Sequence, residues 1–389
     1  MYNPSGTYNF TRVSGTHLQG KTDEDVRYIV PTANSNTTNV PSAICDTFQN
    51  ATRIDFNSMR LVHIGVNSFR NCKGLEYLDL NYNLITEIDD YAFEGNSNLL
   101  RLYLERNELT RIHENVFTSL VNLKMLVLTY NQFSVLPENV FTSLINLKTL
   151  DLNFNKINDL PKNIFASLVN LESLVLTNNE LKALRVEWFE SLNQLKSLYL
   201  RSNKIKELPS NIFSSSKELI SIELGFNNLS VIHSNSFGIL SNLTYLYVNN
   251  NQINAFDQNL IDDTGVRTLD FRENMCADFS IYDDSDTRLQ MRLQLLKCFE
   301  NYNNLEPETT TVATTTTTTA ITLPPGCIAG NLDKRVCRLE DVDEEFRDNF
   351  FTQNVLNNEF KENFKNQSFA IEELERKIAE LAHRPCACS

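Results

Sequence analysis

The chain has 389 residues, of which 41% are hydrophobic, so it is long enough to bury a sizeable core. Its formal net charge of −14 excludes the basic stripe that a nucleic-acid partner needs, and it disfavours attachment to anionic membranes. No apolar run approaches the length of about 18 residues that a membrane span requires. These properties predict a folded acidic protein that has no membrane span and does not bind nucleic acid.

Residues 1–50 are predicted to form a lead-in and an N-terminal cap. The opening sequence MYNPSGTYNFTRVSGTHLQG is polar and has no apolar stretch of the kind found in a secretory leader. We expect irregular structure up to about residue 26, with room for one cap strand. The stretch VPSAICDTF at 40–48 aligns with LPENVFTSL at 136–144, which makes it the back half of a first repeat.

A phrase of the form LxxLxLxxNxL recurs from Leu75 to Ile253 with a period of 24 residues. Its leading leucine, position one of each repeat, falls at Leu75, Leu99, Leu123, Leu147, Leu171, Leu195, Leu219 and Leu243. A fixed period of this size is typical of a solenoid. ATRIDFNSMRL at 51–61 is a degenerate earlier copy, and VRTLDFRENMC at 266–276 is a last copy that arrives one residue early. The sequence therefore predicts a solenoid of about ten repeats over residues 51–276.

The expected fold class is an α/β solenoid, a horseshoe with a parallel sheet on its concave side. Each repeat supplies one short strand, a turn and an ascending segment, with positions one, four, six and eleven facing the core. A polar ladder is expected at position nine, where an amide can bond open backbone groups: Asn83, Asn107, Asn131, Asn155, Asn179, Asn203, Asn227, Asn251 and Asn274. A buried spine is expected at position nineteen: Phe69, Phe93, Phe117, Phe141, Phe165, Phe189, Phe213 and Phe237. Because the phenylalanine recurs in every repeat, it indicates core packing and not a cofactor box.

Two cysteine pairs are placed to close the ends of the solenoid. Cys45 takes a spine position and Cys72 lies three residues beyond the next one, so both point inward and predict a disulfide. An alternative is that Cys45 pairs with a residue outside this sequence. Cys276 replaces the inward residue at position eleven of the last repeat, and Cys298 ends the amphipathic stretch DTRLQMRLQLLKCF. We expect these two to close a helical C-terminal cap over residues 277–302; metal binding is the alternative, without a CxxC or His pairing to support it.

Residues 303–326 are predicted to form a Thr-rich linker, which resembles an O-glycosylated stalk and has no apolar periodicity. Residues 327–389 are predicted to form a Cys-bearing, coiled-coil-like segment, because apolar residues recur at steps of three and four from Phe346 to Leu381. A single amphipathic helix folded back on the solenoid is the alternative. The candidate intermolecular cysteines are Cys327, Cys337, Cys386 and Cys388, which can also pair with one another.

Several features predict a secreted, extracellular glycoprotein whose leader is missing from this sequence. N-x-S/T sequons are glycosylation candidates at Asn9, Asn36, Asn50, Asn228, Asn242 and Asn366. The even number of cysteines and the Thr-rich tract agree with an extracellular location. A cytosolic protein with chance sequons is the alternative.

The sequence predicts no catalytic residues, no cofactor and no metal site, and therefore not an enzyme. His63, His113 and His233 fall on convex turns, where we expect them to be solvent residues, and no Ser-His-Asp or Cys-His spacing occurs. The variable positions five, seven and eight point to the concave face or its rim. Their aromatic and Arg side chains have the composition of a binding surface, and the predicted partner-binding residues are Tyr82, Tyr103, Arg106, Tyr130, Phe154, Tyr199, Phe226 and Tyr247. Cross-strand aromatic pairing that serves only the fold is the alternative.

The repeat LxxLxLxxNxL with its phenylalanine column resembles the extracellular leucine-rich repeat, as in Toll-like receptor and Slit-like ectodomains. The order of solenoid, Cys-closed cap, Cys-bearing segment and coiled-coil-like helix resembles the secreted leucine-rich-repeat immune proteins of mosquitoes (the LRIM family). Cys327 and Cys337 are most like that family's cysteine motif, whereas the short coil and the Thr-rich linker depart from its pattern.

The resemblance implies innate-immune recognition or the carrying of a complement-like partner. It also implies a protein ligand on the concave face and a disulfide-linked homo- or heterodimer joined through the C-terminal helix and cysteines. The alternative function is a non-catalytic leucine-rich-repeat subunit, or a binding protein like those of the extracellular matrix or receptor ectodomains.

Overall fold

The structure, a computed structural model, describes residues 27–30, 38–40, 44–282 and 287–305. All of these belong to one compact unit within residues 1–312. The predicted Thr-rich linker, the coiled-coil-like segment with its four cysteines, and the sequons at Asn9, Asn36 and Asn366 lie outside the described residues.

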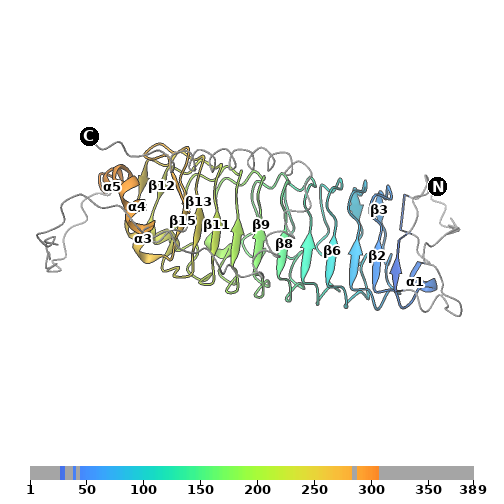
Figure 1. Cartoon of the computed structure of the whole chain (residues 1–389). Coiled ribbons are helices and arrows are strands. Elements are labelled where there is room, and N and C mark those ends of the chain that lie inside the picture. Colours follow the sequence, from blue (N-terminus) through green and yellow to red (C-terminus); the bar gives the residue numbers. More distant parts are fainter. Residues whose placement is uncertain (1–26, 31–37, 41–43, 283–286, 306–389) are drawn as a thin grey trace, which may run out of the picture. The chain divides into compact units, whose positions relative to one another are not determined.

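Twelve short strands form one sheet in chain order (Figure 1). They are β1 (Tyr28–Ile29), β2 (Arg53–Asp55), β4 (Tyr77–Asp79), β6 (Arg101–Tyr103), β7 (Met125–Val127), β8 (Thr149–Asp151), β9 (Ser173–Val175), β10 (Ser197–Tyr199), β11 (Ser221–Glu223), β13 (Tyr245–Tyr247), β15 (Thr268–Asp270) and β16 (Ser280–Ile281). Neighbours pair in parallel, except that β16 is antiparallel to β15. The parallel solenoid that the sequence predicts is thus confirmed, whereas β1 and the reversed strand β16 extend it at the two ends.

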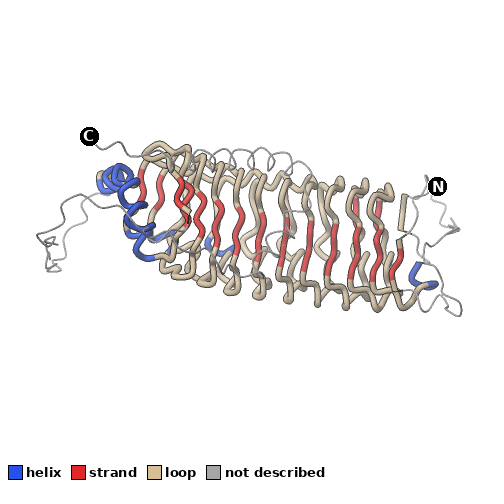
Figure 2. The backbone as a smooth tube through the Cα atoms, in the orientation of Figure 1, coloured by secondary structure: helices blue, strands red, loops and turns tan. Residues whose placement is uncertain are grey.

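The rest of each turn is mostly loop, as Figure 2 shows. Two small parallel sheets are separate from the main sheet. One pairs β3 (His63–Ile64) with β5 (Glu87–Ile88), and the other pairs β12 (Val231–Ile232) with β14 (Ala255–Phe256). Short helices occur at α1 (Ile44–Thr47), α2 (Ser234–Phe237) and α3 (Asn259–Asp263), and one 3-10 turn at η2 (Val186–Trp188).

The asparagine ladder closes the backbone of each turn. Asn155 is representative: its Nδ2 donates to the carbonyl oxygens of Leu128, Leu152 and Asn153 at 3.0–3.2 Å. Its Oδ1 accepts from the backbone N–H of Phe133 at 3.1 Å. One buried amide therefore satisfies polar groups of two adjacent turns, where the chain leaves the strand and cannot bond to itself.

The phenylalanine column forms a continuous buried spine. Every ring from Phe69 to Phe237 in this column is at most 1% exposed. From Phe69 to Phe165 consecutive rings lie 5.8–6.4 Å apart with planes within 13° of parallel. Beyond Phe189 the rings tilt by 57–70°. The change follows η2, where the fully buried Trp188 enters the core and donates its Nε1–H to the carbonyl oxygen of Pro161 at 3.1 Å.

The cysteines pair as the sequence predicts at both ends of the solenoid. Cys45 and Cys72 have Cα atoms 4.9 Å apart, and Cys276 and Cys298 have Cα atoms 5.2 Å apart, both ordinary disulfide spacings. The C-terminal stretch forms two helices instead of the single one expected, α4 (Thr287–Gln294) and α5 (Leu296–Asn303), which are separated at Leu295. Leu295 at the break is fully buried, and Cys298 and Phe299 of α5 are buried too. The break therefore lies against the core, and α5 covers it.

None of the helices in the described residues has the length and apolar character needed to cross a bilayer.

Candidate protein-binding surface on the concave face

The concave face is the side of the main sheet that points away from the core. Each repeat strand spans positions three to five, and in most strands the middle residue is buried while its two neighbours are half-buried. Because side chains alternate along a strand, positions three and five lie on the same face. Positions seven and eight continue this face to its rim, so we define the concave face by positions three, five, seven and eight of each repeat.

Position eight adopts left-handed backbone in all ten repeats. The φ angles lie between 49° and 60° at Ser58, Tyr82, Arg106, Tyr130, Phe154, Asn178, Ser202, Phe226, Asn250 and Glu273. Glycine and asparagine tolerate this region best, yet only two of these residues are asparagine and none is glycine. Large side chains therefore occupy a position where the backbone itself disfavours them.

Four of the predicted binding residues form one continuous stack along this rim, which we call the aromatic ridge: Tyr82, Arg106, Tyr130 and Phe154. The rings of Tyr130 and Phe154 are parallel within 7°, with centroids 4.1 Å apart. The Arg106 guanidinium lies 4.2 Å from the Tyr130 ring centroid and 5.4 Å from that of Tyr82. Tyr82 is 45% exposed, and Arg106, Tyr130 and Phe154 are half-buried, so the stack presents ring edges and a cation at the rim.

The predicted residue Tyr103 belongs to a second cluster nearer the N-terminus. Its ring lies 5.1 Å from that of Tyr77, and its hydroxyl donates to the sulfur of Met125 at 3.3 Å. Arg53 covers the other side of Tyr77, at 3.7 Å from the ring centroid. Burial raises the pKa of both tyrosines. Three residues of this cluster occupy position three and were not among the predicted residues: Arg53, Tyr77 and Met125. Strand alternation places position three on the same face as position five, so it could have been predicted in the same way.

The remaining predicted residues, Tyr199, Phe226 and Tyr247, lie toward the C-terminal end of the face. Phe226 is 41% exposed, and the Arg201 guanidinium packs on its ring at 4.0 Å. Tyr199 and Tyr247 flank Glu223 in register on β10, β11 and β13. The structure therefore divides the eight predicted residues among three separate groups on one face.

Carboxylates on the concave face are held in a partly desolvated environment. Burial is the largest cause that raises the pKa of Asp79, Glu105, Asp151 and Glu223 above ordinary carboxyl values. Asp79 and Asp151 are compensated by backbone N–H donors two residues on, at 2.9 Å each. Glu105 lies 3.5 Å from the Nε of Arg106. The face thus combines aromatic rings with carboxyl groups whose ionised form a hydrogen-bond donor or a cation of a partner would stabilise.

His63 and His233 of the convex turns are half-buried and have partners, which corrects the expectation of solvent residues for these two, whereas the side chain of His113 is 41% exposed. The Nε2 of His63 lies 2.9 Å from Asp89 Oδ1, and the Nδ1 of His233 lies 2.9 Å from the Tyr302 hydroxyl. His63, Glu87 and Asp89 bring their ligand-type atoms within 4.8 Å of one another. Arg111 pairs with Glu87 at 2.8 Å, so these residues form a polar network between neighbouring turns.

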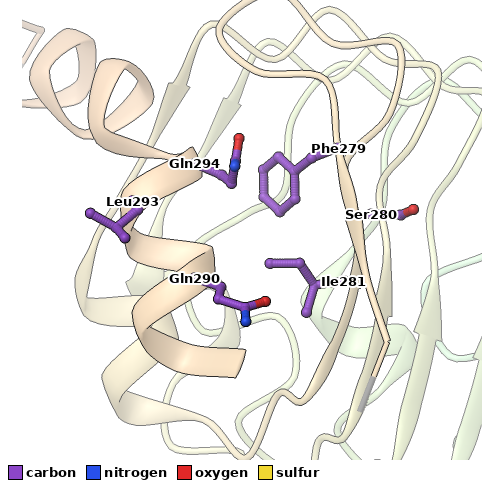
Figure 3. A pocket seen from close by; sticks show the side chains of 6 residues that line it. All are labelled: Phe279, Ser280, Ile281, Gln290, Leu293 and Gln294. Atoms are coloured by element: carbon purple, nitrogen blue, oxygen red, sulfur yellow. The ribbon is translucent and has the colours of Figure 1, made fainter. Parts of the chain in front are cut away.

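An open hollow lies beside the C-terminal cap (Figure 3). Gln290 and Gln294 of α4 face Phe279 and Ile281 across it, whereas Leu293 points away from it. Leu289, Leu293 and Leu296 of the cap are each about 60% exposed, at 62%, 60% and 59%. The hollow has no ionisable side chain among its lining residues. It offers apolar contact and amide groups but no acid or base.

Three of the six predicted glycosylation sites fall on described residues, and all three asparagines are exposed: Asn50, Asn228 and Asn242. The Nδ2 of Asn242 also donates to the carbonyl oxygen of Lys217 at 3.4 Å. None of the three occupies a position of the concave face as defined here. A glycan at any of them would be attached outside that face.

Comparison with known proteins identifies the repeat. The family model described as leucine rich repeat matches residues 49–107, 74–133, 122–181, 169–222 and 193–253. No curated protein matches the chain.

Solved structures similar to this chain include the following two. One is the octameric complex of Latrophilin 3 (Lec, Olf), Unc5D (Ig, Ig2, TSP1) and FLRT2 (LRR), with 22% identity, a TM-score of 0.56, and coverage of 65% of this chain and 82% of that chain. The other is a leucine-rich-repeat protein of Leptospira interrogans, with 22% identity, a TM-score of 0.42, and coverage of 68% and 81%.

Proposed function

The chain belongs to the leucine-rich-repeat family, whose matches span residues 49–253 and so more than half of its length, and on this premise we propose that it is a secreted scaffold that binds a protein partner through its concave face. A leucine-rich-repeat domain is a general protein-interaction scaffold. The solenoid at 51–276 is the binding part in this proposal, and the Cys-bearing segment at 327–389 is the assembling part. The role is recognition and carriage, without catalysis.

The aromatic ridge is the observation that carries the proposal. A residue with a β-carbon pays about 1–2 kcal/mol to adopt left-handed backbone, and the ridge accepts this cost at four successive repeats. Asn178 and Asn250 show that a small, well-suited side chain can serve the same turn. Tyrosine and arginine are among the side chains that contribute most binding energy at protein interfaces, and phenylalanine is enriched in interface cores. Strained positions that carry such side chains point to function.

The ridge also pairs side chains across strands, as the alternative interpretation expects. Ring stacking contributes about 0.5–1.5 kcal/mol per pair, which offsets part of the backbone cost. Fold support and binding are compatible here, because the stack fixes the rings in place before a partner arrives. A preorganised surface loses less side-chain entropy on binding.

The finer assignment is innate-immune recognition or the carrying of a complement-like partner, with assembly through Cys327, Cys337, Cys386 and Cys388. The order of solenoid, closed cap, Cys-bearing segment and helical pattern supports it, together with the sequons and the Thr-rich tract. The second candidate is a non-catalytic subunit, or a binding protein of the matrix or receptor-ectodomain kind. It is supported by the FLRT2 (LRR) component of the complex that shares this fold.

A paired experiment tests the proposal. The chain is expressed with a heterologous leader, and its gel migration is compared with and without reductant; a disulfide-linked dimer runs at twice the monomer mass only without reductant. Wild type and the double variant Tyr130→Ser, Phe154→Ser are then used to capture and cross-link partners from the extracellular fluid of the source organism.

Val135→Ser is the matched control, because Val135 is 61% exposed but lies outside the concave face. Loss of a captured partner in the double variant but not in the control supports the proposal. Equal capture by all three proteins contradicts binding at the ridge.

A further inference from the structure

The position-five residues Tyr199, Glu223 and Tyr247 lie side by side on three adjacent strands. Their Cα atoms are partners in the parallel pairings β10–β11 and β11–β13. Backbone hydrogen bonds from Leu200 to Glu223 at 2.8 Å and from Leu224 to Tyr247 at 2.7 Å hold this register. The carboxylate is therefore flanked by one tyrosine on each side within a rigid sheet.

The Glu223 carboxylate makes no hydrogen bond or ion pair with any residue in the described part of the chain. This distinguishes it from Asp79 and Asp151, whose oxygens accept backbone N–H groups. It also differs from Asp270, which pairs with Arg272 at 2.6 Å. Burial raises the pKa of Glu223, in agreement with a partly desolvated and uncompensated acid.

The nearest cation is already engaged elsewhere. Arg201 lies close enough to lower the pKa of Glu223 through its charge, but its guanidinium packs 4.0 Å from the ring centroid of Phe226. Within the described part of the chain, its side-chain contact is this ring and not the Glu223 carboxylate. The negative charge of the carboxylate is therefore not neutralised by an ion pair within the described residues.

The strand of Glu223 carries small residues on both sides of the carboxylate. Its neighbours on the same face are Ser221 at position three and Gly225 at position seven, both small. A β-carbon at Gly225 would lie 2.5 Å from Oδ1 of Asn249, so a larger residue there would require the Asn249 side chain to move. The flanking strands carry the larger residues Tyr199 and Tyr247 at the same position.

We propose that Tyr199, Glu223 and Tyr247 form a subsite for a lysine or arginine side chain of the protein partner. The proposal rests on the proposed function, since it names the chemistry that the concave face would recognise. The carboxylate supplies a charge-assisted hydrogen bond to the cation, and the two rings supply cation–π attraction.

The dimensions of the sheet suit such a cation. Adjacent parallel strands lie about 4.8 Å apart, so the two tyrosines are separated by about 9.6 Å at the backbone. A cation above Glu223 is then about 5 Å from each tyrosine strand, a lateral spacing that leaves both side chains within reach of it. A hard divalent ion is a poorer occupant, because it requires several oxygen ligands and this group offers one carboxylate.

The test uses short blocked peptides as probes, acetyl-Gly-Lys-Gly-amide and acetyl-Gly-Arg-Gly-amide, with the neutral norleucine peptide as the matched ligand. Binding is followed by NMR of isotope-labelled tyrosine rings. The Lys and Arg peptides should shift the signals of Tyr199 and Tyr247, whereas the norleucine peptide should not. Glu223→Gln should weaken binding by about tenfold, the size expected for loss of one charge-assisted contact.

Two further variants separate the roles. Glu108→Gln removes the same charge at an exposed site outside the concave face and should leave binding unchanged. Tyr199→Phe keeps the ring and should bind normally, whereas Tyr199→Leu should bind more weakly. Thermal unfolding shows whether each variant is folded, and the leucine variant tests the subsite independently of Glu223→Gln.

An equal response to the norleucine peptide, or an unchanged response of both Glu223→Gln and Tyr199→Leu, would overturn the subsite. Such a result would leave the proposed function standing, because that function is tested by partner capture with variants of Tyr130 and Phe154. Peptide binding without any partner captured at the ridge would instead support the subsite and count against the proposed function.

Discussion

The ring of Tyr130 lies flat on the ring of Phe154, with 4.1 Å between centroids and 7° between planes. Both residues hold left-handed backbone, with φ of 53° and 49°. Two unfavourable backbone conformations on adjacent turns thus place two rings in a favourable contact. The pair lies at the centre of the ridge that we propose as a binding surface, and its energetics can be measured without knowing the partner.

A double-mutant cycle should show coupling between these rings. Tyr130→Ala and Phe154→Ala, singly and together, should give a coupling free energy of about 0.5–1.5 kcal/mol in denaturant unfolding. A cycle between Tyr130 and Phe226, which lie four repeats apart, should give a value near zero. A coupling no larger than in that distant pair would show that the stacked geometry contributes nothing to stability.

Replacing Ser202 by glycine should stabilise the fold. Ser202 has a φ of 54°, a conformation that costs a residue with a β-carbon about 1–2 kcal/mol and costs glycine almost nothing. After allowing for the greater flexibility of unfolded glycine, we expect a gain of about 0.5–1 kcal/mol in the free energy of unfolding. Ser197→Gly, within strand β10, is the control and should destabilise. A loss of stability at Ser202 would mean that its side chain makes an essential contribution.

Loss of one ladder amide should lower the free energy of unfolding substantially. Asn155→Ala would leave three carbonyl oxygens and the N–H of Phe133 without their side-chain partner in a site that is 8% exposed. We expect the free energy of unfolding to fall by about 3 kcal/mol, the upper end for an unsatisfied buried polar group. Asn158→Ala removes an amide from the exposed surface of the same repeat and should change stability by less than about 0.5 kcal/mol. Similar effects of the two changes would refute the special role of the ladder.

The pH dependence of stability should have opposite signs at Asp151 and Asp159. Burial raises the pKa of Asp151 in the folded state, so this carboxyl favours folding only when protonated. That contribution is present below the unfolded value of about 3.9 and is lost as the pH rises through the folded pKa. Asp151→Asn mimics the protonated acid. Its melting temperature should exceed that of wild type at pH 7, and the two should converge near pH 3.

At Asp159 the hydrogen bonds from Arg185, at 2.7 and 3.3 Å, lower the pKa. The stabilising contribution of this carboxylate is present above its unfolded pKa and is lost as the pH falls through the folded value. Asp159→Asn should therefore melt below wild type at pH 7 and approach it in acid. Parallel pH profiles for the two variants would contradict the assigned causes.

The repeat length of 24 residues by itself determines most of the fold. A fixed period places each inward leucine, each ladder asparagine and each spine phenylalanine in a column, because a turn of a solenoid can bury its apolar face only against an identical neighbour. The same repeat register places Cys45 next to Cys72. It also placed Tyr82, Arg106, Tyr130 and Phe154 on one rim, since columns are a property of spacing alone.

The tertiary structure determines the side-chain contacts that a repeat period does not specify. Whether Tyr130 stacks on Phe154, and whether Arg106 packs between two rings, depends on rotamers and on the left-handed turn that aims them. The break at Leu295 depends on the open end of the core that α5 must cover. That the Glu223 carboxylate has no hydrogen-bond partner among the described residues, while Asp151 has one, depends on where neighbouring donors point. These are contacts between particular atoms, and a one-dimensional pattern specifies only which residues are neighbours.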